Sequence, residues 1–328
     1  MKKLLHIRDL VVEFPVQGVS NKLRAVDGVS FSIGDNEVVG LVGESGCGKT
    51  TTGNSIIGLA PVSSGSISFC GRQINLRTAT ETRQFRRDVQ MIFQDPMGSL
   101  NPRLTMGDVL LETLFVHRRH LDLPTKELRR YRTEELLDLV GLGIEYYTRY
   151  PHELSGGQRQ RIGIARALAV RPKLLIADEP VSALDVSIQV QILNLLKDLS
   201  RELSFACLFI AHDLAVVRYM CDRTMVMYLG EIVEEAKSEE LFSNPRHPYT
   251  RALLSAVPDV VKGLASRHSK SDRIILQGEV PSRLEPITGC PFSSRCPHVA
   301  EKCHTEKPKP VHFENEHMAC CHFAGIWS

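Results

Sequence analysis

The sequence has no apolar run long enough to cross a membrane, and it has almost no excess of charge of either sign. A membrane-spanning helix needs about 18 or more consecutive apolar residues. The N-terminal segment MKKLLHIRDLVV is interrupted by His6, Arg8 and Asp9, so it lacks the continuous apolar stretch of a signal peptide. We therefore expect a cytosolic protein that reaches a membrane only through its partners.

A net charge of +2 over 328 residues gives no electrostatic reason to expect nucleic acid as a partner. The apolar content of 43% is ordinary for a globular protein and excludes a largely disordered chain. This length allows one large domain and a smaller one. The nine cysteines do not indicate a disulfide framework in a chain expected in the cytosol.

The order of the expected elements indicates an α/β fold. Residues 1–75 are expected to form short strands, and helical spacing dominates from about 100 to 170. Apolar runs at 173–180 and 206–213 are typical of strands buried in a parallel sheet, and residues 186–203 between them have the spacing of a crossover helix. A change in composition near Asn244 predicts a domain at 1–240, with a helical subdomain at about 96–170, and a Cys-rich extension at 241–328.

The segment GESGCGKT, from Gly43 to Thr50, fits the phosphate-binding pattern G-x-x-x-x-G-K-[ST] between an expected strand and an expected helix. Its glycines let backbone N–H groups surround phosphates at the N-terminus of the helix. Lys49 can reach the β- and γ-phosphates of ATP, and Thr50 can offer its hydroxyl to Mg²⁺. The predicted ATP-binding loop comprises Gly43, Glu44, Ser45, Gly46, Cys47, Gly48, Lys49, Thr50 and Thr51, with Cys47 as a spacer.

The segment LLIADE, residues 174–179, supplies carboxylates for a nucleotide hydrolase. Four apolar residues indicate a buried strand, and Asp178 at its carboxyl end can hold Mg²⁺. Glu179 follows directly, where a general base for the attacking water could lie. A pair of carboxylates after a strand can also cap the next helix, but the phosphate-binding pattern favours the catalytic interpretation.

A second anion site is predicted at LSGGQ. Ser155 is suited to cap a helix, Gly156 and Gly157 let a phosphate approach the backbone, and Gln158 begins the helix beyond them. A single phosphate-binding loop has no use for a second anion site in a separate lobe. We therefore expect two copies of the fold to be arranged head to tail, each presenting this segment to the nucleotide of the other.

In this order and spacing, GESGCGKTT, IFQD, LSGGQ, LLIADEP, SALD and IAHD resemble the ATP-binding subunit of an ABC transporter over about residues 1–235. The resemblance implies a RecA-like P-loop core with an antiparallel β-subdomain and a helical subdomain. Gln94 resembles the glutamine that touches Mg²⁺ and the attacking water, Asp185 the aspartate that crosses the dimer interface, and His212 the histidine that bonds the γ-phosphate. Phe14 lies where the family has an aromatic that stacks on adenine, although a core phenylalanine remains an alternative.

The tail, with NPRHPYTRALLSAVP and GCPFSSRCPHVAEKC, is similar to the C-terminal region of ATPases from oligopeptide and dipeptide importers, and the central motifs resemble the second ATPase subunit of such permeases. This implies peptide import driven by ATP at the cytoplasmic face of the inner membrane. The implied partners are a second ATPase subunit (a paralogue), two transmembrane permease subunits and an extracytoplasmic binding protein. A nickel or glutathione importer, an exporter and a soluble ABC ATPase are the alternatives.

The tail also has a pattern of cysteines that predicts a metal site. Successive cysteines from Cys290 are separated by five, six and sixteen residues, which is wider than the short knuckles of structural zinc sites. The wider loops favour a 4Fe–4S cluster, as does the resemblance to peptide-permease ATPases. Zn²⁺ and reduced structural thiols are the alternatives, Cys321 competes as the fourth ligand, and His298, His304 or His322 could serve a zinc site. The predicted cluster ligands are Cys290, Cys296, Cys303 and Cys320.

Overall fold

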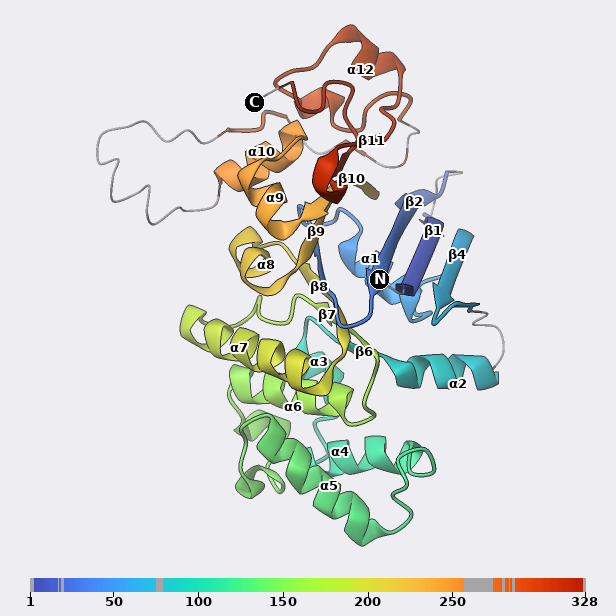
Figure 1. Cartoon of the computed structure of the whole chain (residues 1–328). Coiled ribbons are helices and arrows are strands. Elements are labelled where there is room, and N and C mark those ends of the chain that lie inside the picture. Colours follow the sequence, from blue (N-terminus) through green and yellow to red (C-terminus); the bar gives the residue numbers. More distant parts are fainter. Residues whose placement is uncertain are drawn as a thin grey trace, which may run out of the picture. The chain divides into compact units, whose positions relative to one another are not determined.

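The computed structural model describes residues 3–16, 18, 21–74, 79–256, 274–278, 281–282, 284 and 287–326. They fall into two compact units. Unit 1 comprises Met1–Lys2, Gly34–Glu37 and Ile74–Phe209, and unit 2 comprises Lys3–Ile33, Val38–Gln73 and Ile210–Ser328. Figure 1 labels most of the helices and strands along the chain. Residues 257–273 of the predicted C-terminal extension lie outside the described part.

Unit 2 contains an antiparallel sheet of four strands in the order β2-β1-β4-β5. Apolar and polar residues alternate along these strands, so that one face of the sheet is buried, as in Leu5, Ile7 and Ile67. The register pairs Ile7 with Ile67 across β1 and β4. The strands are β1 (Lys3–Phe14), β2 (Leu23–Gly34), β4 (Ser64–Phe69) and β5 (Arg72–Gln73).

A second group of strands in unit 2 has the order β11-β12-β10-β9-β3. β3 pairs in parallel with β9, and β9 and β10 form a hairpin, with Leu229 and Gly230 both at positive φ, as a two-residue type I′ turn requires. The strands are β3 (Val38–Val42), β9 (Arg223–Tyr228), β10 (Glu231–Lys237), β11 (Val311–His312) and β12 (Met318–Ala319).

The described helices of unit 2 include α1, which follows the predicted phosphate-binding loop, and several short helices of the tail. α8 packs on β3, where an ideal Cβ on Gly40 would come within 2.6 Å of Val217 Cγ1. The helices are α1 (Lys49–Ile56), α8 (Leu214–Met220), α9 (Ser238–Ser243), α10 (Pro248–Ser255), η3 (Ser293–Arg295), α12 (Glu301–Thr305) and η4 (Glu314–Glu316).

A buried polar network joins the tail to β10. Glu234 is fully buried and accepts hydrogen bonds from the backbone N–H groups of Arg246 and His247 and from the His317 ring. Burial lowers the pKa of His247 to about 4, so its ring is neutral at pH 7, and its Nδ1 accepts the Tyr249 N–H at the start of α10. Because each of these contacts satisfies a buried group, the tail is fixed to the sheet by hydrogen bonds as well as by apolar packing.

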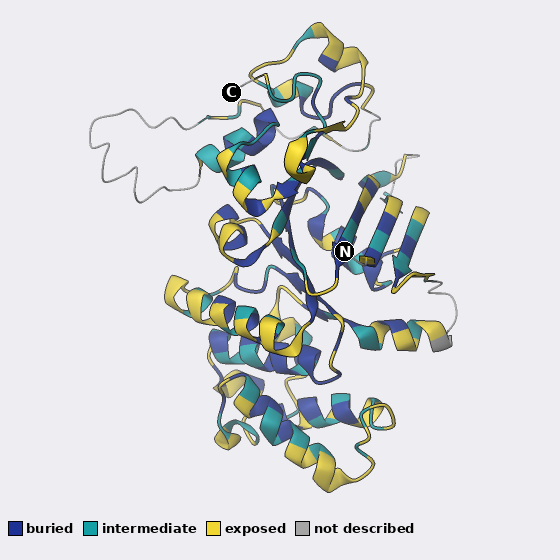
Figure 2. Cartoon of the chain, viewed as in Figure 1, coloured by how far each residue is buried: buried dark blue, intermediate teal, exposed yellow. Residues whose placement is uncertain are grey.

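Unit 1 is built on the parallel pair β6–β7, with β8 next to β7. All five residues of β7 are buried, as its apolar sequence predicts (Figure 2). The strands are β6 (Val89–Ile92), β7 (Leu174–Asp178) and β8 (Ala206–Ala211), of which the residues up to Phe209 belong to this unit.

The helices of unit 1 confirm the predicted helical character between residues 100 and 170, and α7 has the bounds that the spacing predicts. Its buried residues are Ile192, Leu193, Leu196 and Leu199, whereas Leu203 at its end is 41% exposed. The helices are α2 (Ala79–Asp88), α3 (Pro96–Ser99), α4 (Met106–Val116), α5 (Lys126–Leu139), η1 (Ile144–Tyr146), η2 (Pro151–Glu153), α6 (Gly156–Leu168) and α7 (Val186–Leu203). Within the described residues, no helix is both long enough and apolar enough to span a membrane.

Candidate nucleotide site and cysteine cavity

The phosphate-binding loop connects β3 to α1 in unit 2, and its backbone leaves no room for side chains at two positions. Gly43 has a φ of 156°, and an ideal Cβ there would lie 2.2 Å from the Met227 carbonyl oxygen. Gly48 has a φ of 110°, and its Cβ would lie 2.4 Å from the Ala25 carbonyl oxygen. Any other residue would therefore push the loop away from the strands beneath it.

The Lys49 side chain is buried inside this loop and bonds its backbone. The residue is 4% exposed, and its ammonium donates hydrogen bonds to the carbonyl oxygens of Gly43 at 2.8 Å and Glu44 at 3.0 Å. No side chain caps α1 at Gly48, which leaves the helix N-terminus to an anion. Thr50 is exposed in the first turn of α1, next to this helix N-terminus. This arrangement can bind the phosphates of a nucleotide.

In unit 1 the structure brings Gln94 and Glu179 together. The Gln94 amide donates to the Glu179 carboxylate at 2.9 Å, which joins the end of β6 to the end of β7. Asp178, the last residue of β7, is 2% exposed. Glu179 has a φ of 45°, in the left-handed region that non-glycine residues rarely adopt. Strained backbone of this kind persists only where the surrounding fold holds it in place, and it is concentrated at functional sites.

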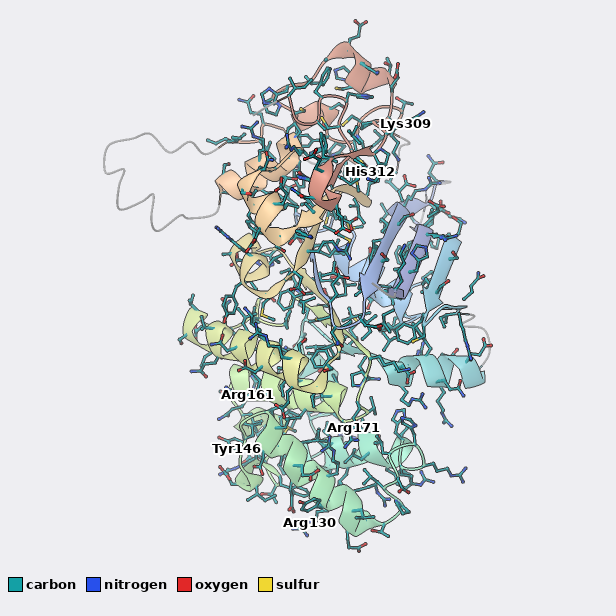
Figure 3. All side chains as sticks on the ribbon, viewed as in Figure 1. Arg130, Tyr146, Arg161, Arg171, Lys309 and His312 are labelled. Atoms are coloured by element: carbon teal, nitrogen blue, oxygen red, sulfur yellow. The ribbon has the colours of Figure 1, made fainter. Side chains whose placement is uncertain are left out.

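The predicted second anion site forms the start of α6. The Ser155 hydroxyl accepts the N–H of Gln158, and the Gln158 side chain accepts the N–H of Ser155, which makes a complete capping box. The Gln158 amide also donates to the hydroxyl of Tyr146 of η1 at 2.8 Å. Tyr146 is labelled in Figure 3. The exposed Ser155 is thus held at a helix N-terminus, where an anion is favoured.

The two glycines of this segment have a packing role that the sequence reasoning missed. An ideal Cβ on Gly157 would lie 2.5 Å from Ile188 Cγ2 of α7, and one on Gly156 would lie 3.1 Å from Leu184 Cδ2. Gly157 is buried by this contact. Small residues are therefore needed here to let α6 approach α7, whether or not a phosphate is bound.

The remaining predicted residues occupy positions at the ends of elements. Phe14 is half-buried at the end of β1, and the exposed His212 follows β8; both belong to unit 2. In unit 1, Asp185 is exposed before α7, and its side chain does not cap that helix. In open α/β sheets, ligands bind at the carboxyl ends of the strands, which is where His212 lies.

Four of the five cysteines of the tail line a cavity of about 10 Å³ in unit 2, about the space of one water molecule. Cys290, Cys296, Cys303 and Cys321 contribute to its wall, together with Phe292 and several histidines. The predicted ligand Cys320 does not: its sulfur contacts Met318 Sδ at 3.7 Å. Cys320 and Cys321 directly follow the strand β12, and adjacent side chains along a strand point to opposite sides. This places Cys321 on the cavity in place of Cys320.

Three of the four cavity sulfurs accept a hydrogen bond from the backbone N–H two residues later. The donors are Phe292 for Cys290, His298 for Cys296 and Phe323 for Cys321. Burial raises the pKa of the Cys290 thiol to about 12, and the neighbouring cysteines of the cavity contribute to this rise. The N–H donors act in the opposite direction, since they stabilise the thiolate that a metal would bind.

A single metal ion has no prepared site in the part of the chain that the structure describes, because no three His, Cys, Asp or Glu side chains there are grouped closely enough. A 4Fe–4S cluster has a different requirement. Each of its four thiolates binds a different iron, so the sulfurs lie further apart than around one ion. The four cysteines that line the cavity could supply such a set of thiolates, but the described residues show no metal site there.

Comparisons with known proteins give a family match for each of two regions of the chain. Residues 26–182 match the ABC transporter family, and residues 233–303 match the oligopeptide/dipeptide transporter C-terminal region. The chain is 47% identical to the oligopeptide transport ATP-binding protein AppF of Bacillus subtilis over 97% of both chains. It is also 47% identical to the oligopeptide transport ATP-binding protein OppF of Salmonella typhimurium, over 94% of this chain and 92% of the other.

Among solved structures, the dimeric ATP-binding cassette MJ0796 bound to ADP and Pi is similar to the chain, with a TM-score of 0.64 and 31% identity. The match covers 71% of this chain and 98% of the cassette. Three observations indicate the same family: the identity over nearly the whole chain, the two matched regions and the geometry of the phosphate loop. The chain belongs to the ATP-hydrolysing subunits of ABC transporters, in the group that carries the oligopeptide/dipeptide transporter C-terminal region.

Proposed function

We propose that this protein powers the import of di- and oligopeptides by hydrolysing ATP on the cytoplasmic face of the cell membrane. The observation that carries the proposal is the match of residues 233–303 to the C-terminal region of peptide transporters, next to an ABC cassette. The named relatives with 47% identity over nearly the whole chain support it. Its partners are two transmembrane permease subunits, an extracytoplasmic binding protein and a second ATPase subunit, which we take to be a paralogue.

Each candidate residue has a role in this proposal that follows from its chemistry. Lys49 and the N-terminus of α1 hold the phosphates of ATP, Glu179 accepts a proton from the attacking water, and His212 bonds the γ-phosphate. Phe14 offers a ring face to adenine. The oxygen donors suited to Mg²⁺ are Thr50, Asp178 and Gln94, and the cation neutralises charge on the phosphates.

The proposal includes a composite ATP site in a head-to-tail dimer. Ser155, Gly156, Gly157 and Gln158 of one subunit face the nucleotide held by the partner, and Asp185 crosses the interface. The exposed, capped N-terminus of α6 supports this arrangement, because it offers an anion site on the surface of its own unit. Loss of the γ-phosphate after hydrolysis removes a contact that favours the closed dimer, so that the pair opens.

Replacing Ser155 by Asp should weaken anion binding at the start of α6 and keep the helix cap. Aspartate caps a helix as well as serine does, so α6 should remain intact, but its charge repels the γ-phosphate. We expect ATP-dependent dimer closure to weaken at least about tenfold, because juxtaposed like charges cost several kcal/mol. ATP binding to the isolated subunit, measured by titration, should stay unchanged.

Ser155→Asn is the matched control, since asparagine caps the helix without adding a charge. The Ser155→Asn dimer should close in ATP nearly as well as the native dimer, as measured by crosslinking or light scattering. Weakened ATP binding by the isolated Ser155→Asp subunit would show that the segment acts on the nucleotide of its own chain, and the composite site would be wrong.

We further propose that the cavity binds a 4Fe–4S cluster through Cys290, Cys296, Cys303 and Cys321. The four sulfurs around one cavity and the N–H donors to three of them support it. The present volume of the cavity requires the surrounding loops to move outward when the cluster enters. Zn²⁺ remains the alternative occupant. In either case the site supplies a structural link between segments of the tail that have little apolar core of their own.

The proposed function is tested by purifying the complex from the native membrane and reconstituting it in vesicles. The ATPase should copurify with two transmembrane subunits and a binding protein, and ATP should drive uptake of a labelled tripeptide when that binding protein is present. Nickel or glutathione as the bound ligand would identify a related importer in its place. Absence from the membrane fraction would indicate a soluble ABC ATPase and contradict the proposal.

A further inference from the structure

Glu44, the second residue of the phosphate-binding loop, contacts Lys49 and two residues of the C-terminal extension, Tyr249 and Arg295. Its backbone N–H donates to the hydroxyl of Tyr249 on α10 at 3.0 Å, and its carbonyl accepts from Lys49. Its carboxylate accepts two hydrogen bonds from Arg295, at 2.7 and 3.0 Å. Tyr249 and Arg295 follow Glu44 by 205 and 251 positions, so the tail fixes both the main chain and the side chain of one loop residue.

The Arg295–Glu44 pair differs from an ordinary surface ion pair. The Arg295 side chain is 8% exposed and that of Glu44 is 29% exposed. Two parallel N–H···O bonds between a guanidinium and a carboxylate fix the relative orientation of both groups, which a single bond does not. Exposed pairs are weak because long side chains lose entropy and water screens them, and neither objection applies fully here.

The position of Arg295 is itself determined by packing. Its guanidinium lies 6.0 Å from the centre of the Tyr228 ring, and Tyr228 contacts both Tyr249 and Phe292 at centroid distances of 4.6 and 5.3 Å. All three rings are almost fully buried. Because Arg295 has lost most of its freedom before it meets Glu44, the pair can hold the loop in place with little further loss of entropy.

The charge of Glu44 matters because of where it lies. A loop that receives the phosphates of ATP carries this carboxylate one residue after Gly43. An unpaired carboxylate there would repel the phosphates, whereas one neutralised by Arg295 does not. Arg295 therefore has two effects on the loop: it fixes the shape of the backbone and removes an opposing charge.

We propose that Arg295 is a positioning residue for the phosphate-binding loop and acts on ATP binding through Glu44. The turn that carries it, η3, lies between Cys290 and Cys296 of the cavity, so the C-terminal extension contributes to the nucleotide site of its own chain. This inference concerns ATP binding and does not depend on what the transporter carries.

The test measures the dissociation constant for ATP, the kcat and KM of ATP hydrolysis and the thermal midpoint of the full-length chain. Arg295→Ala should weaken ATP binding about tenfold or more and raise KM more than it lowers kcat, since it leaves the half-buried Glu44 carboxylate charged and without Arg295. Arg295→Lys keeps the charge but cannot form the two parallel bonds, so its affinity should lie between those of Arg295→Ala and the native chain.

A double-mutant cycle distinguishes positioning from a general loss of stability. Glu44→Gln alone should weaken ATP binding less than Arg295→Ala, because it leaves no unpaired carboxylate. The double variant Arg295→Ala/Glu44→Gln should bind ATP as Glu44→Gln does. The matched control is Arg223→Ala, which breaks a pair of similar burial with Glu235 in the same unit. It should lower the thermal midpoint and leave the ATP dissociation constant unchanged.

Two results would overturn the proposal. One is a fall in the thermal midpoint of Arg295→Ala with native affinity for ATP, as in Arg223→Ala. The other is simple addition of the Arg295→Ala and Glu44→Gln effects on affinity. If Arg295→Ala does not fold, the other two single variants decide. The proposal is then overturned if both Arg295→Lys and Glu44→Gln bind ATP with the dissociation constant of the native chain. Failure of peptide uptake with this coupling intact would instead contradict the proposed transport function alone.

Discussion

Replacing Glu179 by Gln is expected to lower ATP turnover by about 100- to 10,000-fold while ATP still binds, because general base catalysis contributes about this much. Glutamine has the same shape and can still accept the hydrogen bond from Gln94, so the contact that places residue 179 is retained. Its amide cannot take a proton from the attacking water. The γ-phosphate then persists, and the closed dimer should accumulate in ATP, as measured by size-exclusion chromatography.

Two controls make the Glu179 result specific. Lys49→Ala should lose ATP binding and so never reach the closed dimer, since it removes the cation inside the phosphate loop. Asp198→Asn changes an exposed carboxylate on α7 and should leave turnover unchanged. Native turnover by the assembled Glu179→Gln transporter would show that another group activates the water.

Replacing Cys321 by Ser is expected to abolish the metal content of the tail, whereas Cys320→Ser should keep it. The two cysteines are adjacent in sequence, but only the Cys321 sulfur lines the cavity and accepts a backbone N–H. Protein purified without oxygen should be brown, with iron and acid-labile sulfide in near-equal amounts. The Cys321→Ser protein should lose both, because a serine hydroxyl is a poor ligand for iron in such clusters.

The adjacent Cys320→Ser variant is the matched control for the loss of a thiol in this segment. Loss of iron in Cys320→Ser, with retention in Cys321→Ser, would restore Cys320 as the fourth ligand. Colourless native protein with one zinc per chain would replace the cluster by a zinc site. Metal-free native protein that is fully folded would contradict both.

Much of the fold and the backbone geometry of the phosphate loop could be predicted, because local sequence determines them. The glycine pattern of the phosphate loop requires unusual backbone angles wherever it occurs, and the spacing of residues 186–203 predicts the bounds of α7. The burial of β7 follows in the same way from its continuous apolar run. In these cases the residues that decide the structure lie next to one another in the chain.

The features that the sequence did not reveal depend on contacts between distant residues. Cys320 and Cys321 have the same residue type and nearly the same spacing from Cys303, and only the direction of the extended chain after β12 separates them. Nothing near Gly157 indicates that Ile188 fills the space beside it. Arg295 could have been suspected as a lone cation between two cysteines, but its partner lies 251 residues earlier.

The strand order β11-β12-β10 has a consequence for how the protein behaves at high local concentration. Without β12, the seven-residue strand β10 would present unpaired N–H and C=O groups, which can pair with strands of other chains and start aggregation. β12 pairs with it, and the outermost strand β11 has only two residues and follows Pro308 and Pro310. Proline has no N–H to offer, and a strand this short is a poor template. The tail therefore leaves this side of the sheet unsuited to edge-to-edge association.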